Sequence, residues 1–538
     1  MNERLGTVID ASLERGIDVR LDPTVSVEDM VVGRYVTITG KKRRFFGMIT
    51  DVRLGLTDER ISLEPADFAD PFMAEVLNGT STYGIIHVTP MLTIGGQETL
   101  LEGPQPVKTI PGHFTPVQLA TEQDMNIVFG DESEQRFNIG NPLDMETKLC
   151  LDLEEFARRS NGIFGKSGTG KTFLTRILLI GMLQKSKTVN LIFDMHNEYG
   201  WKGTFEGKTS ATVKGLKQLF PEKVAVFTLD EESSRRRKVK TDFVVKIGYN
   251  EITPEDIAIL RSTLNLTDLA VEAAYQLRRS LGKNWIQQVL TRSEDEMEEL
   301  LKGASIHESS FQSLKRGLGI IGRLGFVVPE AKEDAVNSIL NFLQAGKNVV
   351  LEFGRYQEIS AYLLVANLLS RRIYSRYQQQ TEEATASDNE AQKPRPLVIT
   401  IEEAHKFLNP EVSGKTIFGT IAREMRKYNV SLLVIDQRPS GIDEEIMSQL
   451  GTKITCLLDN EKDIDAVLAG VSGKNELKAV LARLAPRQQA LIFGHAVPMP
   501  VAFQPREYGS AESYRALTGG RDELSLAEIQ KDIEDLFD

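Results

Sequence analysis

The stretch that decides the fold is GIFGKSGTGKTFLTRILLIG, residues 162–181, in which glycines and a lysine lie between two apolar runs. Gly165, Gly170, Lys171 and Thr172 satisfy the pattern G-x-x-x-x-G-K-[ST], whose main-chain N–H groups surround the β-phosphate of a nucleotide. The apolar residues before the glycines suit a buried strand, and those after them suit a buried helix. This order predicts a nucleotide site whose phosphates lie at the positive end of a helix.

The residues of this predicted phosphate loop have separate expected roles. We expect Lys171 to reach the β and γ oxygens of ATP and the Thr172 hydroxyl to ligate Mg²⁺. The residues expected to bind the nucleotide are Gly165, Lys166, Ser167, Gly168, Thr169, Gly170, Lys171, Thr172 and Phe173.

A pair of acidic residues follows a second apolar run, in LVITIEEAHKFL, residues 397–408. By position, Glu402 is expected to hold the Mg²⁺ through its water shell, and Glu403 to orient and polarise the attacking water. Adjacent glutamates that open a helix are ordinarily only favourable charges at its positive end, but behind a phosphate loop we interpret them as catalytic. His405 is expected to be a hydrogen-bonding neighbour of this site. Six histidines in the whole chain give no support to a zinc site.

A third apolar run ends in VIDQRPSGID and places Gln437 where it could sense the γ-phosphate or position water. Before this run, Arg423 and Arg426 are three residues apart and therefore share one face of a helix. Guanidinium groups near a nucleotide suit stabilisation of the transition-state charge. Arginines on helices are commonly solvated or ion-paired, so that interpretation also stays open.

Composition limits the classes of function. The chain has 538 residues, 64 basic against 76 acidic side chains and a net charge of −12, which excludes a blanket coat for nucleic acid and requires any polyanion contact to be local. The basic runs at 41–44 and 235–240 are candidates for such contact or are solvated turns. No apolar run is long enough to span a membrane, no leader is visible, and two cysteines suit a reducing compartment. We expect a cytoplasmic protein without a membrane partner.

The chain divides into segments that differ in the pattern of their apolar residues. Residues 1–145 contain short β-branched and apolar runs broken by Gly, Pro and Asp, which predict a β-barrel. Residues 146–248 and 346–508 alternate continuous apolar strands with helices, which predicts an α/β core whose parallel sheet is covered on both faces. Residues 249–345 show helical periodicity and predict a helical insertion on that core.

Polar segments complete the organisation. Residues 378–396 are poor in apolar side chains and end in prolines, which predicts a mobile surface loop. Residues 509–538 end in an acidic amphipathic stretch that we interpret as a strap, with docking on a neighbouring subunit as one use.

The segments GKSGTGKT, FDMHNEYG, IEEAHKFL and AREMRKYNVSLLVIDQRPSGID follow the predicted barrel in this order. In this the chain resembles the HerA family, prokaryotic DNA-translocating ATPases of the HerA–FtsK branch of P-loop motors, over nearly its whole length. The resemblance implies a RecA-like core, a ring that is usually hexameric, ATP bound between subunits and a central channel for double-stranded DNA. It also implies that a HAS-barrel-like N-terminal domain docks a partner, either a NurA-like nuclease in DNA end processing or an effector in antiphage defence.

The resemblance also implies residue roles. The ATPase set would be Lys171, Thr172, Glu402, Glu403 and Gln437, with Arg423 or Arg426 as charge stabilisers and Arg159, or its rival Arg158, donated across the subunit interface. Two departures from the family pattern are Glu402 in place of the usual Asp, and Asp436 where Ser often precedes the Gln.

Three functions therefore stay open. The leading hypothesis is a ring-forming, ATP-driven DNA translocase or helicase that works with a nuclease or a defence effector. The second is an oligomeric scaffold that organises and switches an effector, with hydrolysis as a timer. The third is a protein remodeller, against which the HerA-type motifs weigh.

Overall fold

The structure is a computed structural model. It describes residues 4–58, 81–95, 104–143, 145–205, 208–387, 389, 392–424, 427–471, 473–486 and 488–519. The chain forms two compact units, the first made of Met1–Phe156, Phe164–Lys171 and Gly451–Arg506, and the second of Ala157–Ile163, Thr172–Leu450 and Glu507–Asp538. Among the described residues, no helix is both long and apolar enough to cross a membrane.

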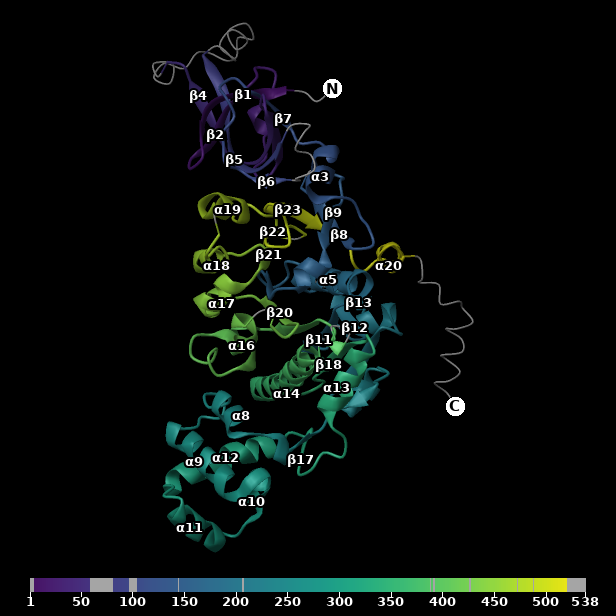
Figure 1. The fold of residues 1–538 in the computed structure, drawn as a ribbon, viewed down its shortest axis with the longest axis vertical. Coiled ribbons are helices and arrows are strands. Elements are labelled where there is room, and N and C mark those ends of the chain that lie inside the picture. The colour runs from purple at the N-terminus through teal and green to yellow at the C-terminus, as the bar shows by residue number, and fades with distance from the viewer. Residues whose placement is uncertain are drawn as a thin grey trace, which may run out of the picture. The chain divides into compact units, whose positions relative to one another are not determined.

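The first unit contains a closed β-barrel, as the sequence predicted (Figure 1). Its strand order is β2-β1-β7-β3-β4-β5, and a pairing between β2 and β5 closes the ring. Alternating residues such as Val8, Val19 and Ile86 fill its interior. The strands are β1 (Arg4–Ser12), β2 (Gly16–Leu21), β3 (Tyr35–Thr39), β4 (Arg43–Leu56), β5 (Thr82–Gly95) and β7 (Pro116–Leu119), with β6 (Gln105–Pro106) added beside β5.

The first unit also holds an antiparallel set of strands in the order β21-β22-β23-β8-β9. These are β8 (Arg136–Pro142), β9 (Leu149–Asp152), β21 (Thr452–Cys456), β22 (Ala490–Gly494) and β23 (Val501–Pro505). The α-helices in the described part of this unit are α3 (Glu122–Phe129), α4 (Leu153–Ala157), α18 (Glu461–Val467) and α19 (Lys474–Leu481). The expectation of parallel strands was therefore wrong for β21 and β22, which pair antiparallel. Apolar composition reports burial on both faces and does not encode direction.

The second unit is built on a parallel sheet in the order β15-β14-β18-β11-β19-β20-β10. The strands are β10 (Asn161–Phe164), β11 (Val189–Asp194), β14 (Val224–Thr228), β15 (Phe243–Val244), β18 (Asn348–Glu352), β19 (Leu397–Glu402) and β20 (Val430–Asp436). Every residue of β11, β14, β18, β19 and β20 is buried, so both faces of the sheet are covered. The predicted α/β core is confirmed.

Helices surround this sheet. They are α5 (Lys171–Lys185), α6 (Leu216–Leu219), α7 (Glu231–Arg236), α13 (Ala335–Gln344), α14 (Ile359–Ala386), α15 (His405–Leu408), α16 (Ile417–Arg423), α17 (Glu444–Gln449) and α20 (Ala511–Thr518). Two small sheets, β12 (Lys202–Phe205) with β13 (Lys208–Lys214) and β16 (Ile247–Gly248) with β17 (Val327–Val328), complete the unit. The tail beyond residue 519, which we interpreted as a strap, lies outside the described residues.

The segment predicted as a helical insertion folds into helices that gather in one group in Figure 1. They are α8 (Pro254–Ile259), α9 (Asp268–Leu281), α10 (Trp285–Thr291), α11 (Glu294–Gly303) and α12 (Glu308–Gly322). The inward face of α9 consists of Ala270, Ala273, Ala274 and Leu277, at helical spacing. Trp285 is fully buried beside it and donates its indole N–H to the carbonyl of Ile252 at 3.2 Å.

The predicted mobile loop at 378–396 was wrong for its first part, because α14 continues to Ala386. Its Gln, Glu and Ala residues are good helix formers. Tyr377, Thr381 and Ala384 also lie on one helical face and are buried. Because the segment contains few apolar residues, this narrow row of buried side chains could not be predicted from its composition.

The buried Lys453 makes the free energy of unfolding depend on pH. Its ammonium group is buried on β21 and donates to the carbonyls of Val467 at 2.8 Å and Ala469 at 3.2 Å. Burial lowers the pKa of Lys453 from its usual 10.5 to about 8. Between these pH values the unfolded chain binds more protons than the folded chain, so the free energy of unfolding rises with pH.

We therefore expect wild type to gain about 1–2 kcal/mol relative to Lys453→Met between pH 8 and 10, measured by chemical denaturation. Lys462→Met, which alters an exposed lysine on α18, is the matched control and should show no such gain. A difference between wild type and Lys453→Met that stays flat across this range would contradict the assignment.

Candidate functional site

The phosphate loop connects β10 to α5, where the sequence placed it. Gly165 has φ +150° and passes so close to β21 that a Cβ there would lie 2.7 Å from the Cβ of Cys456. Gly170 has φ +96°, a conformation that side chains with a Cβ rarely adopt. Both glycines are therefore required by the shape of the turn, which leads the backbone into the positive end of α5.

Main-chain groups hold the side chains of this loop. Lys171 is buried, and its ammonium donates to the carbonyls of Gly165 and Lys166. The Thr169 hydroxyl donates to the same Lys166 carbonyl at 2.7 Å, and the Lys166 N–H donates to the carbonyl of Leu457 at 3.0 Å. The Lys171 ammonium thus faces the inside of the loop, where phosphate oxygens can replace the carbonyls.

The first turns of α5 carry two more of the predicted residues. Thr172 is half-buried at the start of the helix. The ring of Phe173 stacks on Tyr508, with centroids 5.8 Å apart, and Arg176 lies over it at 5.5 Å. In this structure the Phe173 ring is therefore engaged by the segment that leads to α20.

Carboxyl groups gather at one edge of the parallel sheet. Asp194, Glu402 and Asp436 are the last residues of β11, β19 and β20, which pair in parallel. The carboxyl ends of such strands meet at the same edge, which is where open α/β sheets bind their ligands. This group of strand ends is called the acidic edge below.

Glu402 is buried at the acidic edge and held by two tyrosines. Its Oε1 accepts a hydrogen bond from the Tyr199 hydroxyl at 3.0 Å. The Tyr362 hydroxyl accepts from the Glu402 N–H at 2.9 Å and donates to the Glu402 carbonyl at 3.0 Å. Burial, followed by the charge of Asp194, raises the pKa of Glu402 to about 8. The carboxyl therefore retains its proton near neutral pH unless a cation lies next to it.

Asp194 shapes the turn that carries Tyr199. Its carboxylate accepts from the N–H groups of Glu198, Tyr199 and Gly200, at 2.8, 2.8 and 3.2 Å. The segment DMHNEYG is thus a capped turn that places the Tyr199 hydroxyl on Glu402. Burial raises the pKa of Asp194, while those N–H groups and the buried Arg176 oppose the shift.

Glu403, the residue predicted to orient water, has a strained backbone and lies beside Gln437 and His405. Its backbone is left-handed, with φ +48°, which costs about 1 kcal/mol for a residue with a side chain. The Gln437 amide donates to its Oε1 at 3.3 Å, and Nδ1 of His405 lies 3.6 Å from its Oε2. Two predicted residues, Glu403 and Gln437, are therefore brought together at the acidic edge.

Thr172 and Glu402 are the predicted Mg²⁺ residues, and the ion requires oxygen ligands. Among the described residues, no cluster of three or more His, Cys, Asp or Glu side chains is arranged to hold a metal ion. Mg²⁺ in nucleotide sites needs only one or two protein ligands, because phosphate oxygens and water supply the rest. Oε2 of Glu402 is buried and has no hydrogen-bond partner in the described parts of the chain, which leaves it able to accept from a metal-bound water. The residues present fit the ion.

The predicted arginines have different surroundings. Arg423 is the exposed last residue of α16, and its Nε lies 3.3 Å from Oε2 of Glu445 on α17. Arg426 lies outside the described residues. Arg158 is exposed and Arg159 half-buried, directly before β10. The structure therefore does not choose between the two candidates for an arginine shared with a neighbour.

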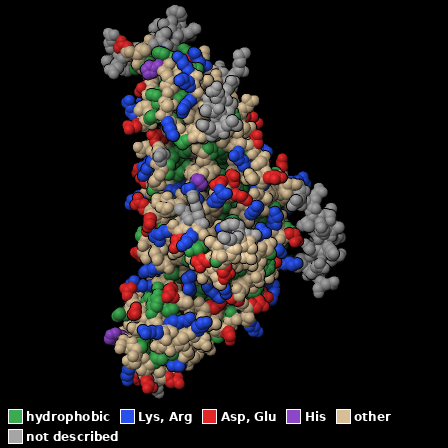
Figure 2. Space-filling view, viewed as in Figure 1, with side chains coloured by type: hydrophobic (Ala, Val, Ile, Leu, Met, Phe, Trp, Pro, Cys, Tyr) green, Lys and Arg blue, Asp and Glu red, His purple; other side chains and the backbone are tan. Residues whose placement is uncertain are grey.

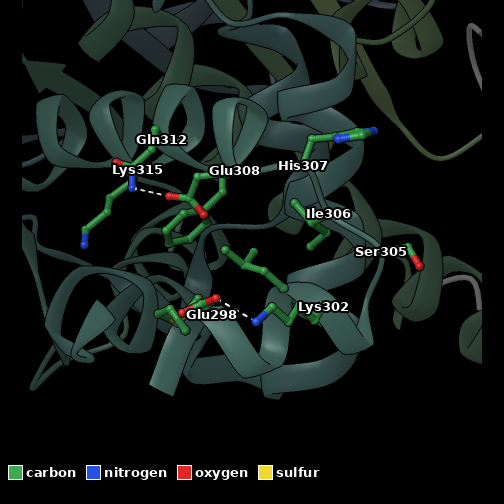
Figure 3. A pocket seen from close by; sticks show the side chains of 11 residues that line it. Glu298, Lys302, Ser305, Ile306, His307, Glu308, Gln312 and Lys315 are labelled. Carbon is green, nitrogen blue, oxygen red and sulfur yellow. Dashed lines mark hydrogen bonds and ion pairs between the residues drawn. The ribbon is translucent and has the colours of Figure 1, made fainter. Parts of the chain in front are cut away.

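A separate pocket lies in the helical insertion, between α11 and α12 (Figure 3). Its volume is about 700 Å³, and its walls combine apolar Met297, Leu301 and Phe311 with charged side chains. The Lys302 ammonium pairs with Glu298 at 2.6 Å, and the Gln312 amide donates to Glu308 at 2.6 Å. Because this pocket has no glycine-rich turn, we do not interpret it as the nucleotide site.

The roles of Tyr199 and Tyr362 and the pairing of Asp436 with His405 were not predicted from the sequence. Tyr199 lies within FDMHNEYG, a segment that carries the HerA resemblance, but its contact with Glu402 joins positions 203 apart in the chain. Tyr362 lies inside a helix among apolar residues and carries no local signal of its role.

Two protein families match the sequence. Residues 137–373 match the family described as "Helicase HerA, central domain", and residues 5–99 match the HAS barrel domain. Together the two matches cover more than half of the chain, in the order barrel then ATPase.

Relatives of known name match most of the chain. The chain is 23% identical over 523 residues to the DNA double-strand break repair helicase HerA of Sulfurisphaera tokodaii, which covers 92% of this chain and 91% of the relative. It is 24% identical over 408 residues to the protein of that name from Pyrococcus furiosus, 71% of each chain.

Solved structures that resemble the chain include VirB4 of Thermoanaerobacter pseudethanolicus, at a TM-score of 0.44 and 14% identity over 71% of this chain and 98% of that one. Another is the bacterial conjugative coupling protein TrwB, at 0.46 and 11% identity over 73% and 95%. The family matches, the long relatives and the phosphate loop agree: residues 137–373 form a domain of the HerA central-domain family of P-loop ATPases, and the chain is an ATP-hydrolysing enzyme.

Proposed function

We propose that this protein is a ring-forming motor that uses ATP to move or unwind double-stranded DNA. The observation that carries the proposal is the Glu403 carboxylate, held by Gln437 at the acidic edge of a chain whose centre matches the HerA central domain. Relatives that match most of this chain are named as DNA double-strand break repair helicases. A carboxylate fixed by a neighbouring amide suits the activation of water, which a mere nucleotide-binding scaffold does not need.

In the proposed mechanism each residue of the ATPase set has its own role. Lys171 holds the β and γ phosphate oxygens, and Glu403 orients the attacking water and accepts its proton while Gln437 fixes the carboxylate. Thr172 and the water shell next to Glu402 would hold Mg²⁺, which neutralises charge on the phosphates when bound. The buried Tyr199 keeps the Glu402 carboxyl in one orientation for that shell.

The ring couples the subunits in this proposal. We infer that nucleotide is hydrolysed at a seam between neighbouring copies, in a ring that is hexameric as the family resemblance implies. Arg159, or Arg158, would reach the neighbour's phosphates, and Arg423 or Arg426 would stabilise the transition-state charge. The exposed position of Arg423 and Arg158 is compatible with contact to a second copy.

The charge pattern limits how DNA is held. Basic and acidic side chains are intermixed on the face seen in Figure 2, in agreement with the net charge of −12. We propose that DNA is held by a small number of basic residues from each copy, and that several copies together give useful affinity.

The barrel is the proposed docking site for a partner. Leu54 on β4 is 79% exposed and Phe114, before β7, is 76% exposed, so the barrel offers apolar side chains for a partner to cover. A NurA-like nuclease or a defence effector would be the occupant, and the motor would act with it in DNA end processing or antiphage defence.

Two substitutions separate binding from hydrolysis. Lys171→Ala should abolish ATP binding, because it removes the charge that holds the phosphates, whereas Glu403→Gln should keep ATP binding and reduce turnover by at least about 100-fold. Fluorescent-nucleotide binding and phosphate release measure the two properties. Lys185→Ala, at the far end of the same helix, is the control and should match wild type. Turnover at the wild-type rate in Glu403→Gln would refute its assigned role.

DNA and assembly give a second test. Double-stranded DNA should stimulate ATP hydrolysis at low salt, and the stimulation should fall as salt rises, because DNA binding releases counterions. Native mass spectrometry of the same sample should show a closed ring. A rate indifferent to DNA, with no DNA binding at low salt, would instead favour the scaffold hypothesis.

Mixed rings test the shared seam. Arg159→Ala and Lys171→Ala should each be inactive alone, but mixing them should restore part of the activity, because some seams then join an intact loop to an intact arginine. Arg158→Ala is the matched rival and identifies which arginine is shared. Full activity of isolated monomers would exclude a seam altogether.

A further inference from the structure

Beyond the residues already assigned, the acidic edge contains a hydrogen-bonded pair, Asp436 and His405. Asp436 is the last residue of β20, and the register pairs Glu402 of β19 with Ile435. Glu403 follows β19 directly, and both Glu403 and Asp436 lie close to His405. His405 follows on α15, two residues after Glu403.

The Asp436 carboxyl is completely buried and fixed by its partners. Oδ2 accepts from the His405 main-chain N–H at 2.6 Å, and Oδ1 accepts from the Arg438 N–H at 2.6 Å. Both oxygens also face Nδ1 of His405, at 3.1 and 3.0 Å. One carboxyl group thus determines both the backbone and the ring of His405.

The contact with Asp436 determines which ring nitrogen of His405 carries the proton. Because the Asp436 oxygens are acceptors, Nδ1 is the protonated nitrogen of the ring. The same Nδ1 lies 3.6 Å from Oε2 of Glu403. This separation is longer than a hydrogen bond, and the single Nδ1–H is donated to Asp436, so the contact with Glu403 Oε2 is electrostatic, whereas Oε1 accepts a hydrogen bond from Gln437.

The ring has little freedom to leave this position. Its side chain is only 17% exposed, and the turn at Gly441 packs against it so closely that a Cβ there would lie 3.2 Å from the His405 Cβ. The His405 carbonyl is held by the Asn409 amide at 3.0 Å.

We propose that His405, oriented by Asp436, is a positioning residue that fixes the Glu403 carboxylate from the side opposite Gln437. The imidazole holds Oε2 electrostatically, so that the strained Glu403 presents one orientation to the attacking water. The inference rests on the proposed role of Glu403 in ATP hydrolysis, and it adds a second support to that residue.

A matched pair of amides tests it in the full-length protein. Asn at 405 places an N–H near the position of Nδ1, whereas Gln places it near Nε2. We expect His405→Gln to lower the kcat for ATP roughly 10- to 100-fold with KM within about threefold, and His405→Asn to retain most of the wild-type kcat. Asp436→Asn should resemble His405→Gln, because its NH2 group replaces one of the two oxygens that accept from the main-chain N–H groups of His405 and Arg438 and so displaces the ring.

A double variant and a control variant test whether His405 and Asp436 act through the same contact. The double variant His405→Gln/Asp436→Asn should be no slower than the worse single variant, since both act through one contact. His113→Ala, an exposed histidine of the barrel, is the control for histidine replacement, and thermal unfolding reports on structure. Equal kcat for the Gln and Asn variants, a change confined to KM, or losses that multiply in the double variant would each overturn the proposal.

The same series separates this inference from the motor itself. Turnover is measured without DNA, so a wild-type protein that DNA fails to stimulate would refute the proposed translocase while the Asn and Gln contrast still decides the role of His405. Wild-type turnover in Glu403→Gln would refute the catalytic role on which both depend.

Discussion

The parallel pairing of β19 with β20 is the constraint on which the site depends. It brings Glu402, Glu403 and Asp436 to one edge of the sheet, although β20 follows β19 only after a helical segment. A slip of one residue in this register would turn every side chain of β20 to the other face. The continuous burial of both strands makes such a slip costly, so the core secures the positions of the proposed catalytic groups.

The burial of several carboxyl groups close together raises their pKa values. Glu402 and Glu352 have pKa values raised to about 8 and about 7, with burial as the leading cause. Arg237 meets Glu352 at 2.6 Å, and Tyr199 meets Glu402 with a neutral hydroxyl. The negative charge of an ionised Glu402 would thus be only partly compensated within the chain. This suits a carboxyl group whose charge is balanced only when a nucleotide and its cation bind.

The strained Glu403 illustrates how the fold supports function. A left-handed residue persists only where its neighbours hold it, and here Gln437, His405 and the end of β20 surround it. The barrel is supported differently: its ring of strands closes through the pairing of β2 with β5, so these strands hydrogen-bond to one another around the ring.

The sequence by itself determined the phosphate loop, the acidic pair, the barrel and the α/β core, because each depends on local spacing or on the periodicity of apolar residues. It did not reveal the antiparallel direction of β21 and β22, the helix through residue 386, or the tyrosines that hold Glu402. Only the tertiary structure decided these, because strand direction, a narrow buried stripe and contacts between distant residues leave no periodic signal in the chain. The same reason explains why Asp436 looked like a departure from a motif until its contact with His405 was seen.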